Sequence, residues 1–99
     1  MNIIESNIDK IRILCVRHKV SKLFVFGSVL KSSFTAECDI DLIVDFNQID
    51  INEYTDNYFD LKDQLELLLQ RPVDLLEEKG IRNPFLRAEI DAQKQLVYG

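Results

Sequence analysis

The chain has 99 residues, 46% of them hydrophobic and 29% charged, which is an ordinary composition for one globular domain spanning residues 1–99. Its 17 acidic and 12 basic residues give a net charge of −5, which argues against a general nucleic-acid binder because such proteins need a basic face. Two cysteines and one histidine argue against a disulfide framework or a structural zinc site. No apolar run approaches the ~20 residues of a membrane span, and the N-terminus lacks a signal pattern. We therefore expect a cytoplasmic protein.

The first half of the chain predicts two helices and two strands. Apolar residues at three- and four-residue spacing predict a helix over residues 2–19. The continuous apolar run Leu23–Phe26 predicts a buried strand. A short helix could follow from Ser28 to about Phe34. Alternation over Asp39–Phe46 then predicts a second strand, with the aspartates and Ile43 on one face and the other apolar side chains on the opposite face.

The second half of the chain repeats the alternation of helix and strand. A capping box at Asp50 opens a long helix that we expect to end near Arg71 and Pro72. A strand follows over residues 73–76. Asn83 and Pro84 then start a helix to about residue 92, and residues 95–98 form a candidate edge strand. We predict an α/β (α+β) fold in which a small sheet is flanked by helices.

One set of residues carries the chemistry. Gly27 and Ser28 end the first predicted strand, and ten residues later Asp39 and Asp41 lie on the same face of the second strand. Side chains two apart on a strand project to one side, roughly 6.5 Å apart along the backbone. Carboxylates so placed can converge on two divalent cations, and Mg²⁺ favours carboxylates together with phosphate oxygens. A third carboxylate, Asp74, opens the third strand.

The turn after the first predicted strand suits phosphate. Gly27 has no Cβ and lets a phosphate approach the backbone closely. Ser28 offers a hydroxyl and a backbone N–H where a helix would begin, and helix N-termini favour anions. The sequence therefore joins a phosphate-binding turn to a platform of carboxylates.

Taken together, these motifs resemble the minimal nucleotidyltransferase (MNT) family of the polymerase-β nucleotidyltransferase superfamily. The resemblance rests on Gly27-Ser28, the ten-residue gap and the segment 39–44, and it continues through Pro72-Val73-Asp74-Leu75 and the segment 83–86. It covers nearly the whole chain. It implies a mixed sheet flanked by helices, as in the polymerase-β-like nucleotidyltransferase fold.

The resemblance also implies an activity, which is transfer of AMP from ATP to an acceptor hydroxyl with two Mg²⁺ ions. It implies that Asp39, Asp41 and Asp74 are metal ligands and catalytic residues, and that Ser28 contacts the triphosphate beside Gly27. Many members of the family are antitoxins paired with a HEPN-domain toxin, and some adenylylate a toxin tyrosine. We therefore expect a protein partner of the HEPN type. Both a homo-oligomer and a hetero-oligomer are compatible with this expectation.

The sequence departs from the family pattern after Ser28. The family often has Ala-Arg-Gly-type residues there, whereas this chain has Val29-Leu30-Lys31. Lys31 supplies a point charge to the nucleotide instead of a bidentate fork. A second hypothesis stays open on this ground: a weak or inactive antitoxin that neutralises its toxin by binding.

Several other polar residues have simpler interpretations. His18 is expected to pack against the core and not to act as a base, and Tyr54 and Tyr58 fall on the core stripe of the long helix. Asp45 lies roughly 13 Å from Asp41 along the strand, too far to share its metal ions. We expect solvated faces for a basic cluster near the N-terminus and an acidic set on the long helix. These are Lys10, Arg12, Arg17, Lys19 and Lys22, and Asp56, Asp60, Asp63 and Glu66.

Overall fold

The computed structural model describes residues 3–26 and 39–99. The elements in chain order are α1 (Ile3–Ser6), α2 (Ile8–Arg17), β1 (Val20–Phe26), β2 (Ile40–Phe46), α3 (Ile51–Leu69), β3 (Val73–Glu77), the 3₁₀ turn η2 (Glu78–Gly80), α4 (Pro84–Gln93) and β4 (Gln95–Tyr98). The predicted mixed α/β fold is confirmed. The predicted short helix from Ser28 to about Phe34 lies outside the described residues.

The four strands form one mixed sheet in the order β3-β2-β1-β4. β1 is antiparallel to both β2 and β4, whereas β2 and β3 run parallel and are joined by α3. Parallel neighbours need such a crossover because the chain must return to the end at which the first strand began. Both β2 and β3 consequently start at the same end of the sheet.

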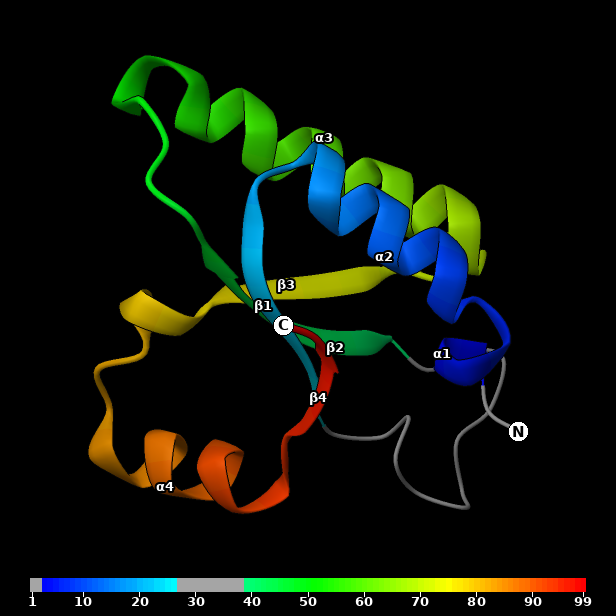
Figure 1. Ribbon diagram of the computed structural model, residues 1–99. Helices are drawn as coiled ribbons and strands as arrows, with labels where there is room; N and C mark the ends of the chain where they lie inside the picture. The colour runs from blue at the N-terminus through cyan, green and yellow to red at the C-terminus, as the bar shows by residue number, and fades with distance from the viewer. Residues whose placement is uncertain (1–2, 27–38) are drawn as a thin grey trace.

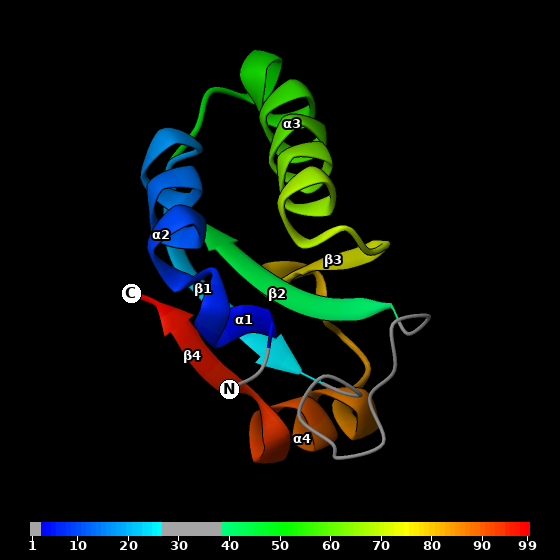
Figure 2. The same cartoon turned by 90° about the vertical axis from the view of Figure 1, so that its right-hand side faces the viewer.

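Helices α1, α2 and α3 cover one face of the sheet, as Figures 1 and 2 show. The inward residues of β2, namely Ile40, Leu42, Val44 and Phe46, belong to the main core cluster with residues of all three helices. Leu61 and Leu65 of α3 are fully buried there. This alternation on β2 fixes which side of the strand its aspartates take, namely the side away from α3.

The other face carries the C-terminal helix. Figure 1 shows α4 below the sheet, opposite α2 and α3. Ile43 of β2 and Ile90 of α4 are both fully buried but lie outside the main cluster. Lys94 lies 4.4 Å from the ring centre of Phe24 on β1. An ion-pair network made by Arg87, Lys94, Glu78 and Asp91 joins α4 to η2. Among the described elements, α4 is the helix on this face, and the aspartates of β2 share the face with it.

The helix starts follow the predicted capping chemistry. The Asp50 side chain accepts a hydrogen bond from the Asn52 amide, and the Asn83 side chain accepts from the amides of Phe85 and Leu86. The single helix predicted over residues 2–19 was wrong in one respect, because the chain breaks at Asn7 into α1 and α2. The Asn7 side chain donates to the Ile3 carbonyl oxygen instead of continuing the helix.

His18 packs in the core as predicted, but it also makes a specific polar contact. It is 6% exposed and lies at the end of α2. Its Nδ1 is 2.8 Å from the Leu14 carbonyl oxygen, and its Nε2 is 2.6 Å from Asp60 Oδ2 on α3. Asp60 lies on the exposed face of α3 as predicted, with 61% of its side chain exposed, and one of its oxygens pairs with this buried ring.

No helix in the described part of the chain is both long enough and apolar enough to cross a membrane.

Candidate active site

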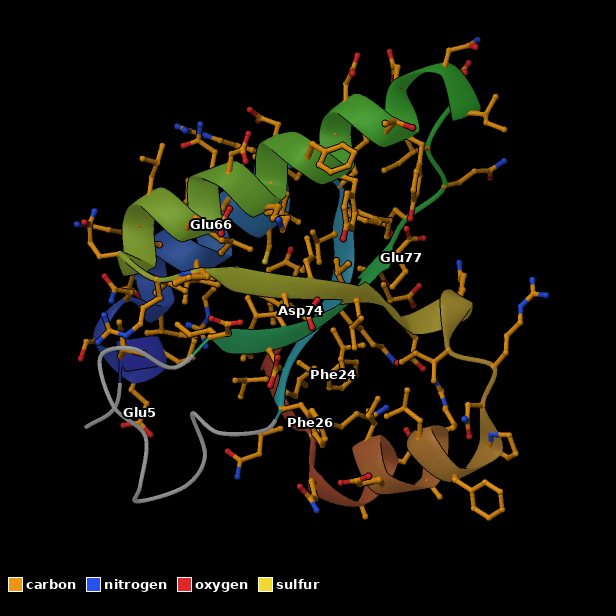
Figure 3. The ribbon with its side chains drawn as sticks, turned by 180° about the vertical axis from the view of Figure 1, so that it is seen from behind. Glu5, Phe24, Phe26, Glu66, Asp74 and Glu77 are labelled. Atoms are coloured by element: carbon orange, nitrogen blue, oxygen red, sulfur yellow. The ribbon has the colours of Figure 1, made fainter. Side chains whose placement is uncertain are left out.

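Two of the three predicted carboxylates are neighbours across the sheet. Asp41 of β2 and Asp74 of β3 are directly paired in the parallel register. Asp39 comes immediately before β2, two residues from Asp41 and on the same side of the strand by alternation. Asp39 and Asp74 are exposed and Asp41 is partly buried. Figure 3 shows Asp74 on β3, with α3 on one side and Phe24 and Phe26 of β1 on the other.

The carboxylates repel one another electrostatically. Partial burial raises the pKa of Asp41 above its usual value, and the negative charges of Asp74 and then Asp39 raise it further. Like charges at close range disfavour ionisation of the group between them. Within residues 3–26 and 39–99, no ion pair to a lysine or arginine offsets Asp41 or Asp74. The pair therefore has the electrostatic character of a cation site.

The C-terminal end of β1 lies at the end of the sheet where β2 begins. Phe26, its last residue, is paired with Asp41 across the antiparallel register. Gly27 and Ser28 follow Phe26 directly in the chain. Gly27, Ser28 and Lys31 all lie outside the described residues, so their nucleotide-binding roles stay predictions.

The donor chemistry fits Mg²⁺. Across the described residues, no group of three His, Cys, Asp or Glu side chains is gathered closely enough to hold a metal ion. Asp41 and Asp74 are nevertheless paired across strands, and the pKa of Asp41 responds to both other carboxylates. Hard oxygen donors of this kind are those that Mg²⁺ prefers, with phosphate oxygens completing the shell. Asp39, Asp41 and Asp74 stay the predicted ligands of a metal ion.

The opposite end of the same strands has a different arrangement. Asp45 Oδ1 of β2 lies 3.5 Å from Lys79 Nζ. Glu77 of β3 accepts a hydrogen bond from the Tyr54 hydroxyl of α3. These carboxylates have partners within the chain, which supports the choice of Asp74 over Asp45 as the third ligand.

Sequence reasoning missed two contacts between α3 and the strand that carries Asp74. Glu66 Oε2 accepts a 3.0 Å hydrogen bond from the Val73 amide, and the Tyr58 hydroxyl donates to the Leu75 carbonyl oxygen. Glu66 was predicted to lie on a solvated face, and that prediction was wrong because its carboxylate turns towards β3. No periodicity in α3 marks Glu66 for this role, since the contact depends on where the crossover returns.

The fold and the Asp41–Asp74 pair define a nucleotidyltransferase of the polymerase-β type. Residues 9–99 match the family described as "Polymerase beta, Nucleotidyltransferase", and the chain belongs to it. The predicted family is therefore confirmed.

The chain is also similar to individual relatives of known description. It is 33% identical over 87 residues to a Methanocaldococcus jannaschii protein named "Putative protein adenylyltransferase", covering 88% of this chain and 84% of the relative. A second protein of that organism with the same description is also 33% identical, with the same coverage. These names support nucleotidyltransferase activity in this family.

Solved structures share the fold. A structure described as a "putative minimal nucleotidyltransferase" has a TM-score of 0.77 at 29% identity, with 96% of this chain and 95% of that chain covered. A chain of the complex of tri-AMPylated Shewanella oneidensis HEPN toxin with MNT antitoxin has a TM-score of 0.66 at 21% identity, covering 97% of this chain and 72% of that chain. The second likeness shows the fold alone.

Proposed function

We propose that this protein is a Mg²⁺-dependent nucleotidyltransferase that transfers AMP from ATP to a protein hydroxyl, as an antitoxin acting on a HEPN-domain toxin in the cytoplasm. The observation that carries the proposal is the in-register pairing of Asp41 with Asp74, with Asp39 two residues away and the end of β1 alongside. Family membership supports the class of reaction, and the three carboxylates are the proposed site for it.

The proposed reaction needs few protein groups. The acceptor oxygen attacks the α-phosphorus of ATP, a new P–O bond forms, and the bond to pyrophosphate breaks. Bound Mg²⁺ ions would stabilise the developing negative charge on the phosphate oxygens. Asp39 and Asp41 would hold the metal, while Asp74 would hold it and accept the proton of the attacking hydroxyl. Gly27, Ser28 and Lys31 bind the triphosphate in this proposal.

A protein acceptor fits the openness of the site. Asp39 and Asp74 are exposed, and of the described helices it is α4 that lies on their face of the sheet. An acceptor with its own surface would complete the site and exclude water. The description of the M. jannaschii relatives as protein adenylyltransferases supports this acceptor class, and the structures of MNT antitoxins with HEPN toxins support the kind of partner.

The test begins with a search of the adjacent reading frames for a HEPN-domain protein, and then measures transfer of label from α-labelled ATP to that protein with Mg²⁺ present. We expect labelling by the wild type and none by a double variant, Asp39→Asn with Asp41→Asn. Asp45→Asn is the matched control, since it removes the same charge from the same face of β2, and it should label as the wild type does. Wild-type protein that never transfers label to this partner would contradict the proposal.

The substitution of Val29-Leu30-Lys31 for the usual family residues favours a second candidate, neutralisation by binding alone. The same double variant separates the two. If Asp39→Asn with Asp41→Asn still neutralises the toxin as fully as the wild type, binding is the mechanism. If neutralisation is lost while the complex still forms, AMP transfer is the mechanism.

A further inference from the structure

The strand that carries Asp74 lies at the edge of the sheet. Among the strands of the described residues, β3 has β2 on one side and none on the other, in the order β3-β2-β1-β4. It is also short, spanning Val73–Glu77. An edge strand loses pairing more easily than a central strand because only one of its sides is held by a ladder. Asp74 is therefore the catalytic carboxylate whose position depends most on additional contacts.

The ladder leaves particular backbone groups of β3 pointing outward. The Ile40 amide donates to the Pro72 carbonyl oxygen over 2.9 Å, which fixes the phase of the parallel ladder. Because backbone groups alternate between the two sides of a strand, those of Val73 and Leu75 point away from β2. They flank Asp74 in sequence, and each needs a partner other than the sheet.

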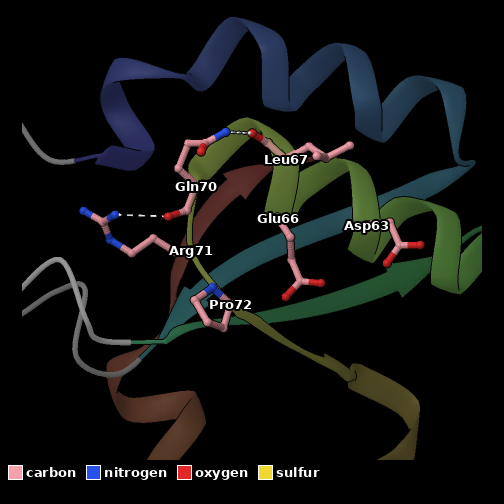
Figure 4. A pocket seen from close by; sticks show the side chains of 6 residues that line it. All are labelled: Asp63, Glu66, Leu67, Gln70, Arg71 and Pro72. Carbon is pink, nitrogen blue, oxygen red and sulfur yellow. Dashed lines mark hydrogen bonds between the residues drawn. The ribbon is translucent and has the colours of Figure 1, made fainter.

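Side chains of α3 provide those partners on both sides of Asp74. Glu66 Oε2 accepts from the Val73 amide over 3.0 Å, and the Tyr58 hydroxyl donates to the Leu75 carbonyl oxygen. Val73 and Leu75 are themselves buried, 4% and 3% exposed. Figure 3 shows Glu66 on α3 beside β3, and Figure 4 shows its carboxylate extending from the helix towards the chain at Pro72.

We propose that Glu66 and Tyr58 are positioning residues that hold the backbone on either side of Asp74, and so keep its carboxylate in register with Asp41. The inference rests on the proposed function for the role of Asp74. Sites that share a metal tolerate displacements of only about 0.5 Å in their ligands. Contacts that fix a ligand's backbone therefore act on metal binding without touching the metal.

Glu66 is the more informative of the two for a test, because its chemistry can be varied in steps. Glu66→Ala removes the acceptor, while Glu66→Gln keeps a carbonyl oxygen that can accept from the Val73 amide. Asp63→Ala is the matched control. Asp63 lies one turn before Glu66 on α3, is exposed, and lines an open pocket together with Glu66. Its replacement by alanine removes a nearby negative charge but keeps the Glu66–Val73 hydrogen bond.

Two measurements on the full chain separate positioning from general stability. The first is the hydrogen-exchange rate of the Val73 amide by NMR. The second is the Mn²⁺ concentration that half-saturates the protein, measured by paramagnetic relaxation well below the melting temperature of every variant. In Glu66→Ala we expect faster Val73 exchange and a half-saturation point raised about tenfold, the lower end for loss of a group that supports a metal ligand. Glu66→Gln and Asp63→Ala should both stay within about twofold of the wild type in half-saturation.

The inference is overturned if Glu66→Ala leaves Val73 exchange unchanged, or if Glu66→Gln weakens Mn²⁺ binding as much as Glu66→Ala does. Should Glu66→Ala fail to fold, Tyr58→Phe takes its place, with faster exchange expected in β3 and an increase in half-saturation in the same direction. Wild-type protein that binds no Mn²⁺ would contradict the proposed function. Val73 exchange would still decide whether Glu66 holds the backbone.

Discussion

The two ends of the β2–β3 pair carry carboxylates in contrasting surroundings. At the far end, Asp45 lies beside Lys79 and Glu77 accepts from Tyr54, so the chain supplies the partners. At the near end, Asp41 and Asp74 face each other, and their mutual repulsion raises the pKa of Asp41. Carboxylates with partners from the same chain stabilise the fold. Carboxylates set against one another cost stability, and the position of this second pair at the edge of the sheet suits a cation.

The largest effect we expect is on catalysis at the near end. Asp74→Asn keeps the shape of the side chain but removes its charge, and AMP transfer should fall on the order of 10³-fold, the scale for losing a group that stabilises charge in the transition state. The matched change at the far end is Glu77→Gln, which can still accept from Tyr54. It should retain transfer within a few-fold. Equal losses in both variants, measured by label transfer, would remove the distinction between the two ends.

A smaller effect is expected on stability at the far end. Tyr54→Phe removes the hydroxyl that donates to Glu77, and burial followed by this contact already raises the pKa of Tyr54. Loss of a hydrogen bond to a charged group should lower the free energy of unfolding by about 1.5–3 kcal/mol. Urea denaturation of the wild type and the variant measures this. Transfer activity at a temperature where both are folded should not change, and a variant that loses activity without losing stability would contradict the assignment.

The smallest effect concerns pH and the metal-free protein. The folded-state pKa of Asp41 lies above its usual value of 3.8, so its contribution to stability is present at low pH and is lost as pH rises through the raised pKa. Asp41→Asn resembles the protonated side chain at every pH. Its melting temperature in EDTA should therefore match the wild type near about pH 4 and exceed it increasingly towards about pH 7. A gap that closes as pH rises would reverse the sign and contradict the repulsion.

Much of the fold could be predicted because local pattern and local structure coincide. The alternation in β2 and the caps at Asp50 and Asn83 depend on neighbouring residues alone. The shared side of Asp39 and Asp41 could be predicted for the same reason, since side chains two residues apart on a strand project to one side. The parallel register that brings Asp74 to Asp41 is set by the path of α3, and the motif indicated it only through family resemblance.

Other features depend on distant parts of the chain and had no signal in the sequence. The Glu66–Val73 and His18–Asp60 contacts each join segments whose approach is decided by tertiary packing. Charged residues on an amphipathic helix are usually solvated, and this rule holds for the exposed Asp60 without predicting its contact with His18, whereas it misses the turn of Glu66 towards β3. The break at Asn7 was missed because the apolar spacing continues across it.

The crossover between β2 and β3 has a consequence for the order of folding. Residues 27–39 separate β1 from β2 along the chain, whereas residues 47–72, which include α3, separate β2 from β3. Contacts that close such a long connection are entropically costly and form slowly. We therefore expect Asp41 and Asp74 to become neighbours in a late step of folding. A ligand that requires both aspartates binds only chains that have completed this step, and by mass action it shifts the population towards them.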